Sequence, residues 1–284
     1  MLLSFFCQNI CFAEILVSNN FCNDTPYQNR IKKNISTYGK PRGTAIVIHG
    51  LNQAPETMAD ISQVLNKIGY ITLRVSLIGH SGESIHGGST KKWLEQIRTA
   101  WCLANQENLE SIVLLGFSMG GSLAVHFTDT YPTLKIDKLI LLAPAIEIKY
   151  FANLLYPLLW LKHFDLSLPA FTPKKYRANN FTSFDTYSAL LDLEDKTQNI
   201  NHIQILSKIP TLLAIDPKDS LVSFSQLKAW VEKKDLVSWN LIEINAQAKI
   251  SGLKHHVIID EDSLGVESWN HLKLNLESFL DKKH

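Results

Sequence analysis

Several kinds of residue are scarce in this chain of 284 residues, and each scarcity excludes a class of protein. Four cysteines are too few for a small scaffold held together by disulfides. Thirteen glycines and ten prolines exclude collagen-like and low-complexity chains. The 28 basic residues are balanced by 27 acidic residues, so no charge excess indicates nucleic-acid binding. With 45% hydrophobic residues, the chain is a globular protein with a large core.

Two familiar cofactor motifs are also missing. Neither the Walker-type phosphate motif nor the dinucleotide-binding G-x-G-x-x-G motif occurs, so we expect no nucleotide cofactor. One cluster has metal-ligating residue types, but no second ligand group with zinc spacing accompanies it. That cluster comprises His255, His256, Asp260, Glu261 and Asp262. The sequence therefore predicts neither a cofactor nor a metal.

The N-terminus is apolar up to Ala13, about the length of the hydrophobic region of a signal peptide. It is shorter than the roughly 20 residues of a membrane-spanning helix. We expect residues 1–13 to be a signal peptide and the protein to be periplasmic or secreted. No Lys or Arg precedes the run, and Gln8 and Asn9 interrupt it. The alternative is therefore a cytoplasmic protein whose first residues pack on the body.

Cleavage after Ala13 would remove two of the four cysteines and leave Cys22 and Cys102. In an oxidising compartment these two can pair as a disulfide, and elsewhere they can remain buried thiols. The sequence leaves both outcomes open.

From residue 44 the chain alternates apolar β-branched runs with amphipathic helical patterns. Runs at 44–49, 70–75, 111–116, 138–143, 211–216 and 240–245 read as buried strands. The alternation predicts an α/β fold with a doubly wound, mostly parallel sheet. We expect residues 14–284 to form one domain.

One segment interrupts this alternation. From about residue 147 to 208 no strand of the buried kind occurs, although leucine and aromatic side chains are frequent. An insertion of this length between two core strands predicts a helical cap over one edge of the sheet.

The chemistry-bearing motif is Gly116-Phe117-Ser118-Met119-Gly120, placed between a buried strand and a helix. A sharp strand-to-helix turn lifts the serine hydroxyl clear of the sheet, and the glycines leave room for that turn. The helix N-terminus also favours developing negative charge at the same point. This context indicates a nucleophilic serine.

A serine hydroxyl needs a base, and the base needs an orienting group. Asp216 and Asp219 follow one later strand, and His255 and His256 follow the next. The chain order Ser, Asp, His is the order of the triad that accompanies this serine motif. These residues are therefore candidates for the acid and the base.

Together these motifs resemble the α/β-hydrolases with an inserted cap, similar to monoglyceride-lipase-like and bacterial carboxylesterase-like serine hydrolases. The resemblance runs from about residue 43 to 281. His49-Gly50 resembles the family's oxyanion loop, and residues 77–84 resemble its loop after the next strand, with Ser81 where glycine is common. Leu141-Leu142-Ala143-Pro144 matches the strand end before the cap.

The resemblance implies a triad of Ser118, Asp219 and His256. The family places the acid two residues before a valine, whereas Asp219 stands three residues before Val222. The family places the histidine directly before apolar residues that lead to an acid, as in 256–260. Asp216 is then expected to cap the turn at Pro217. His255 is expected to be a neighbour that supports the loop.

The family's oxyanion hole maps to the backbone N–H groups of Leu51 and Met119, with Asn52 a near alternative to Leu51. His49 in this loop is expected to be structural rather than basic.

The implied function is hydrolysis of carboxylic esters, carboxylesterase or lipase-like, through an acyl-enzyme on Ser118. The substrate would be a small ester with an apolar acyl group, and the cap could make weak contact with a membrane surface. Peptidase, thioesterase and C–C hydrolase activities remain alternatives, because one triad supports all of them. A non-catalytic binding protein is the other alternative. It predicts that at least one triad residue has been replaced, and no such replacement is seen.

Overall fold

A computed structural model describes residues 21–35, 39–80, 88–149, 157–160, 163–164, 166–247 and 256–282. The predicted signal peptide at 1–13, the loop residues 81–84 and His255 lie outside the described residues. The export prediction is therefore untested by the structure.

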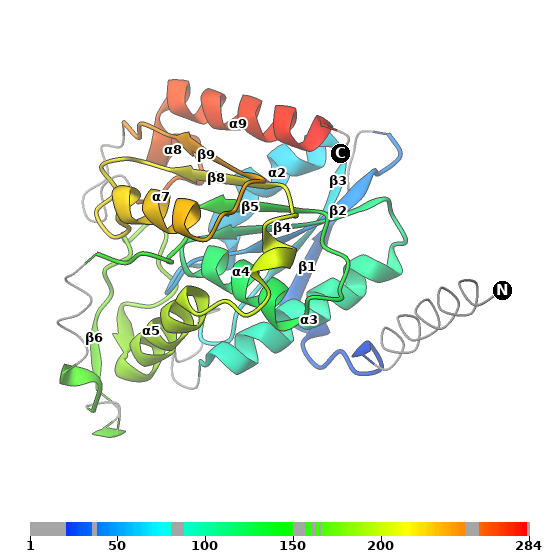
Figure 1. Ribbon diagram of the computed structural model, residues 1–284. Helices are drawn as coiled ribbons and strands as arrows, with labels where there is room; N and C mark the ends of the chain where they lie inside the picture. The colour runs from blue at the N-terminus through cyan, green and yellow to red at the C-terminus, as the bar shows by residue number, and fades with distance from the viewer. Residues whose placement is uncertain are drawn as a thin grey trace.

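Seven strands form the central sheet. They are β1 (Ile31–Asn34), β2 (Gly43–Ile48), β3 (Tyr70–Val75), β4 (Ser111–Phe117), β5 (Lys138–Leu142), β8 (Thr211–Ile215) and β9 (Trp239–Glu243). Their order is β1-β3-β2-β4-β5-β8-β9, and all neighbours are parallel except β1 with β3 (Figure 1). The predicted doubly wound, mostly parallel sheet is confirmed.

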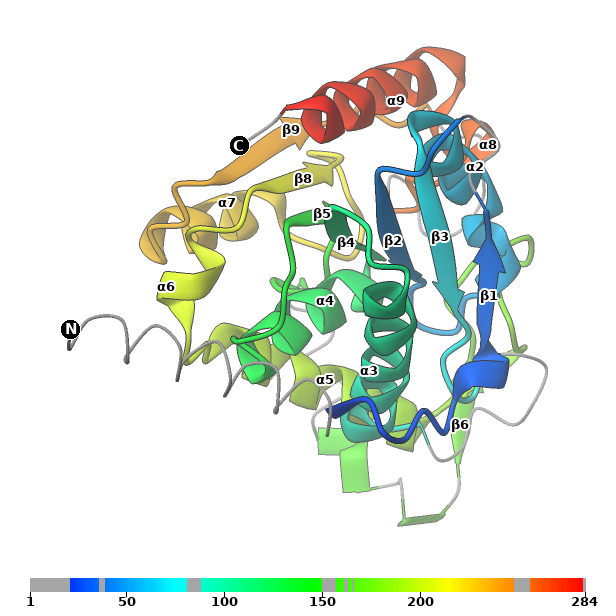
Figure 2. The ribbon, with the colours of Figure 1, turned by 90° about the vertical axis from the view of Figure 1, so that its right-hand side faces the viewer.

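Helices cover both faces of this sheet. The longer ones are α2 (Ala59–Ile68), α3 (Thr90–Gln106), α4 (Met119–Thr130), α5 (Phe184–Gln198), α7 (Phe224–Lys233) and α9 (Val266–Asp281). Short turns of helix are η1 (Gln28–Arg30), η2 (Pro55–Met58), α6 (Ile203–Leu206) and α8 (Glu261–Leu264). Figures 1 and 2 show α2 and α9 on one face and α3 and α4 on the other. None of these helices, among the residues described, is both long and apolar enough to cross a membrane.

The register of the central strands brings their carboxyl ends to one edge. β2 and β4 run side by side with Ile48 opposite Gly116, and β4 and β5 continue the alignment with Phe117 opposite Leu142. Every residue of β2, β5 and β8 is buried, as expected for strands covered on both faces. The loops that follow these strands therefore meet above one edge of the sheet.

Some elements were not predicted from the sequence. β1 is an antiparallel edge strand of four residues in which Lys32 and Lys33 are exposed, so it lacks the apolar run that marked the core strands. α7 and α8 were also missed. Between β5 and β8 the chain forms α5, α6 and an antiparallel hairpin of β6 (Ser167–Pro169) and β7 (Phe181–Ser183). The inserted segment is thus part hairpin and part helix, and its limits at 147 and 208 stay a prediction.

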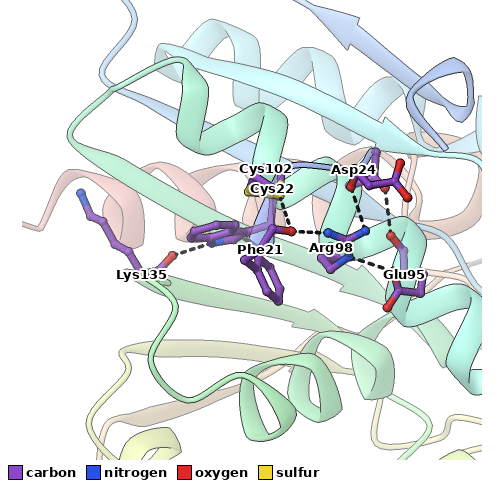
Figure 3. Close-up of a disulfide and its surroundings, with 9 residues drawn as sticks. Phe21, Cys22, Asp24, Glu95, Arg98, Cys102 and Lys135 are labelled. Carbon is purple, nitrogen blue, oxygen red and sulfur yellow. Dashed lines mark hydrogen bonds and ion pairs between the residues drawn. A yellow bond between two sulfur atoms is a disulfide. The ribbon is translucent and has the colours of Figure 1, made fainter. Parts of the chain in front are cut away.

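A disulfide joins Cys22 to Cys102 across 80 positions of sequence (Figure 3). Cys102 lies on α3, and the Arg98 guanidinium one turn earlier donates hydrogen bonds to the carbonyl oxygens of Phe21 and Asp24. The same guanidinium lies 5.3 Å from the centre of the Phe21 ring. The segment before β1 is therefore fastened to α3 by a covalent bond and by one arginine.

Candidate active site

Ser118 stands in the turn between β4 and α4, where the backbone is strained and crowded. Its φ of 52° lies in the left-handed region, which is uncommon for a residue other than glycine. A Cβ at Gly116 would lie 2.2 Å from the Gly120 carbonyl oxygen, and a Cβ at Gly120 would lie 2.3 Å from that of Ile48. The two glycines therefore permit the sharp turn that raises the serine above the sheet edge.

His256 connects the serine to a carboxylate. Its Nε2 atom lies 3.0 Å from Ser118 Oγ, and its Nδ1 atom lies 2.8 Å from Asp219 Oδ2. Because a carboxylate only accepts hydrogen bonds, Nδ1 carries the ring proton and Nε2 presents its lone pair to the hydroxyl. His256 and Asp219 are 3% and 0% exposed, so water does not compete for these contacts.

The two candidate acids have different partners. Asp219 Oδ1 accepts the backbone N–H groups of Leu221 (2.7 Å) and Val222 (2.9 Å), which hold the carboxylate toward the imidazole. Asp216 instead accepts the N–H groups of Lys218 (2.7 Å) and Ala246 (2.6 Å) and so ties two loops together. The structure brings Asp219, and not Asp216, to the histidine.

Two backbone N–H groups are candidates for an oxyanion hole. Met119 is the first residue of α4, and the first N–H groups of a helix have no partner within it. Leu51 lies in the wall of the same cavity as Ser118. His49 Nδ1 lies 2.8 Å from the Gly50 carbonyl oxygen, and the carbonyl and N–H of a trans peptide point in opposite directions. This contact therefore restrains one side of the peptide that carries the Leu51 N–H.

His49 itself is fully buried. Its Nε2 accepts the backbone N–H of Leu77 at 3.1 Å, and Nδ1 donates to the backbone oxygen of Gly50. Burial, assisted by the neighbouring His80, lowers the pKa of His49 to about 3. A neutral imidazole with both nitrogens engaged has the structural role that the sequence suggested.

The sequence matches one known protein family over most of its length. Residues 39–234 match the family described as serine aminopeptidase, S33. The chain belongs to this α/β-hydrolase family. Among curated proteins, none matches the sequence.

Solved structures share the hydrolase fold at low sequence identity. The monoacylglycerol lipase of Paleococcus ferrophilus superposes with a TM-score of 0.67 at 19% identity, covering 88% of this chain and 98% of its own. A soluble variant of the Saccharomyces cerevisiae monoglyceride lipase gives 0.68 at 14%, covering 88% and 90%. An esterase from Exiguobacterium antarcticum gives 0.60 at 17%, covering 89% and 95%. The architecture is thus that of lipases and esterases.

The hydrolase has a cavity of about 90 Å³ that Ser118 and His256 help to line. Most of its wall is apolar, and both the sheet edge and the cap contribute. Representative apolar residues are Phe117, Ile148, Leu191 and Val257, and representative polar ones are Asn52, Thr182 and Tyr187. Among the described residues, no Asp, Glu, Lys or Arg side chain lines the cavity.

The described members of the candidate metal cluster have other partners. Within the part of the chain that the structure describes, no group of three His, Cys, Asp or Glu side chains is arranged to bind a metal. His256 is engaged with Asp219, and Asp260 caps α8 by accepting the N–H of Ser263 at 2.8 Å.

The sequence did not mark Tyr176, and it marked Asn52 only as an alternative oxyanion donor and not for the contacts by which it joins the cap to the loops of the site. The Tyr176 hydroxyl donates to Asp260 Oδ1 at 2.9 Å, four residues after the histidine. The Asn52 side chain, 1% exposed, bonds to the cap at residues 179–182. No local pattern marks these contacts, because each partner lies more than 80 positions away in the sequence.

Proposed function

We propose that this hydrolase cleaves carboxylic esters through an acyl-enzyme on Ser118. The observation that carries the proposal is the buried relay in which His256 Nε2 lies 3.0 Å from Ser118 Oγ and Nδ1 lies 2.8 Å from Asp219. A serine hydroxyl becomes an effective nucleophile when a neutral imidazole is placed to accept its proton.

In the first half-reaction, Ser118 Oγ attacks the ester carbonyl carbon while its proton passes to His256 Nε2. The carbonyl oxygen becomes an oxyanion, which the N–H groups of Leu51 and Met119 would stabilise. The imidazolium, held by Asp219, then protonates the leaving alcohol as the C–O bond breaks. Water, deprotonated by the same imidazole, attacks the acyl-enzyme. As the bond from the acyl carbon to Oγ breaks, the imidazolium returns the proton to Ser118 Oγ, and the carboxylic acid is released.

The cavity supports an apolar acyl group of short or medium length. Its volume of about 90 Å³ corresponds to on the order of six to nine water positions. Burial of apolar carbon in such a wall is favourable at roughly 25 cal/mol per Å². We therefore expect turnover on p-nitrophenyl esters to peak below long-chain lengths.

The family's description raises aminopeptidase activity as a second candidate. An aminopeptidase must hold the substrate's ammonium group, and a buried charge needs a partner of opposite sign. The described residues that line the cavity include no carboxylate. Ester hydrolysis is therefore the stronger proposal, and aminoacyl-p-nitroanilides serve as the competing substrates.

Labelling with a fluorophosphonate probe tests the proposal directly. We expect the folded protein to be labelled and the Ser118→Ala variant to remain unlabelled. Folded protein that resists the probe while a control esterase reacts would remove the enzymatic function. Faster turnover of thioesters or aminoacyl amides than of every p-nitrophenyl ester would reassign the substrate class.

The cap also carries large apolar side chains that face solvent, and we propose that they make weak contact with a membrane surface. These residues are Leu158, Trp160, Phe164, Leu166, Phe171 and Phe181, which are 41–63% exposed. Sedimentation with phospholipid vesicles tests this: wild type should co-sediment more than a Trp160→Ser, Phe164→Ser double variant. Equal sedimentation of the two proteins would contradict the contact.

The disulfide between Cys22 and Cys102 supports export as a proposal, because such bonds form and persist in oxidising compartments. Mass spectrometry of protein from the native host should give a mature N-terminus at Glu14. A protein beginning at Met1 in the cytosolic fraction would contradict export.

A further inference from the structure

A cap strip, residues 172–182, lies along the loop that carries one candidate oxyanion donor. Gln53 forms an antiparallel bridge with Arg177. The N–H of Ala54 donates to the Tyr176 carbonyl at 2.9 Å, and the N–H of Ala178 donates to that of Asn52 at 3.0 Å. The backbone of the loop is thus paired with the cap strip.

Asn52 adds a side-chain contact at the centre of this pairing. Its Oδ1 accepts the N–H of Asn179 at 2.8 Å, and its Nδ2 donates to Thr182 Oγ1 at 2.8 Å and to the Asn179 carbonyl at 3.0 Å. The side chain is 1% exposed, so losing these partners would leave buried polar groups unsatisfied. Its φ of 47° is one that asparagine tolerates better than most residues.

The backbone on both sides of Leu51 is held by hydrogen bonds. Leu51 is the residue directly before Asn52, and its carbonyl accepts a hydrogen bond from Thr172 Oγ1 at 3.1 Å. The Gly50–Leu51 peptide, to which the Leu51 N–H belongs, is held by His49 through the Gly50 carbonyl. The peptide before it is held by Gln53, whose Oε1 accepts the Gly50 N–H at 2.6 Å. The core therefore restrains the peptide before Leu51, and the cap restrains the peptide after it.

We propose that Asn52 is a positioning residue through which the cap strip sets the direction of the Leu51 N–H. The inference rests on the ester hydrolysis proposed above. An oxyanion donor acts only when it is aimed at the transition state, and a displacement of about 1 Å can cost around 100-fold. The side chain of Asn52 would then raise kcat without touching the substrate's reacting atoms.

Asn52→Ala is the test variant, and Asn66→Ala is the matched control. Asn66 on α2 likewise bonds backbone carbonyls, those of Tyr70 (2.7 Å) and Asn34 (3.3 Å), away from the site. We expect Asn52→Ala to lower kcat about 10- to 100-fold with KM within about threefold. Asn66→Ala should lose a similar amount of thermal stability and keep its kcat.

A trifluoromethyl ketone supplies a readout that general loss of stability would not change. The ketone forms a tetrahedral adduct whose oxyanion occupies the hole, so its affinity should fall by the same factor as kcat/KM. Thr182→Val removes the Nδ2 acceptor from the cap side and should lower kcat in the same direction. Adding it to Asn52→Ala should cause little further loss, because both variants remove one shared contact.

The outcomes separate the two proposals. Wild type that neither reacts with a fluorophosphonate nor hydrolyses esters overturns ester hydrolysis. An active wild type overturns the role of Asn52 if Asn52→Ala keeps its kcat and ketone affinity, or if Asn66→Ala loses as much of both.

Discussion

The two walls of the cavity differ in how their polar groups are held. On the sheet side, Asp219 is fixed by N–H groups two and three residues later, and Ser118 is fixed by the turn between β4 and α4. Where the cap meets the sheet edge, Asn52 of the loop after β2 contacts cap residues 127 to 130 positions later in the chain. The orientation of Ser118 and Asp219 thus depends on local structure, whereas the contact between the β2 loop and the cap depends on long-range pairing.

This difference separates two kinds of failure. Removing Ser118, Asp219 or His256 should abolish the proposed hydrolysis and leave the fold intact, because the strands beneath the site are buried apolar segments. A change on the cap side should leave the Ser–His–Asp relay intact and alter rate by degrees. The variants below test that distinction, in order of decreasing expected effect.

Removing the base should have the largest effect. Without the His256 imidazole, Ser118 loses the base that lies at hydrogen-bond distance from its hydroxyl, so His256→Ala should lower kcat about 10,000-fold or more. Steady-state kinetics on a p-nitrophenyl ester measure the loss. The exposed His271 on α9 offers the control, and His271→Ala should match wild type.

The same substitution at the adjacent His255 tests whether the effect is specific to His256. We expect His255→Ala to cost roughly tenfold or less, on the scale of one lost supporting contact. Near-wild-type turnover by folded His256→Ala would remove the assignment of the base.

The two aspartates test whether position alone decides function. Asp219→Asn loses the carboxylate that holds the imidazole tautomer and should lower kcat about 10,000-fold. Asp216→Asn should instead weaken the link between the β8 loop and Ala246, lowering the melting temperature while kcat stays within about tenfold. Kinetics and thermal unfolding of both variants decide it, and a reversed pattern would make Asp216 the acid.

The core strands and the Ser118 turn could be predicted from the sequence, whereas the contacts between the cap and the β2 loop could not. Continuous apolar runs marked the core strands, and the glycines around Ser118 marked the turn. β1 was not predicted, because two of its four residues are lysines on the edge of the sheet. The Asn52 contacts and the pairing of Cys22 with Cys102 depend on chain segments far apart in sequence, where no periodicity links the partners.

The disulfide offers a long-range contact that is remote from the site. Closing a loop of 80 positions restricts the unfolded chain, so Cys102→Ala should lower the free energy of unfolding by about 2–4 kcal/mol. Activity per folded molecule should be unchanged. Urea unfolding with and without a reductant provides the measurement: reduction should destabilise wild type and leave Cys102→Ala unaffected. Equal sensitivity of both proteins would contradict a bridge in solution.

The smallest effect on stability is expected at Glu194 on α5, where the cap contacts the segment that follows β5. Its Oε1 accepts the backbone N–H of Ile148 at 2.9 Å, and this bond lowers the pKa. Burial is the larger influence, and with the nearby Glu147 and Asp195 carboxylates it raises the pKa of Glu194 from 4.5 to about 7. The folded chain therefore binds this proton more tightly than the unfolded chain does.

The sign of the pH effect follows from that difference. Stability from the protonated Glu194 is fully present below about pH 4.5 and is lost as pH rises toward about 7. Glu194→Gln keeps an amide oxygen for Ile148 and cannot ionise, so its free energy of unfolding should fall less than that of wild type between pH 5 and pH 8. Urea unfolding at both pH values measures it, with Glu267→Gln on the exposed side of α9 as the control. If Glu194→Gln and wild type lose stability equally over this range, Glu194 is ionised throughout and the cap junction is indifferent to pH.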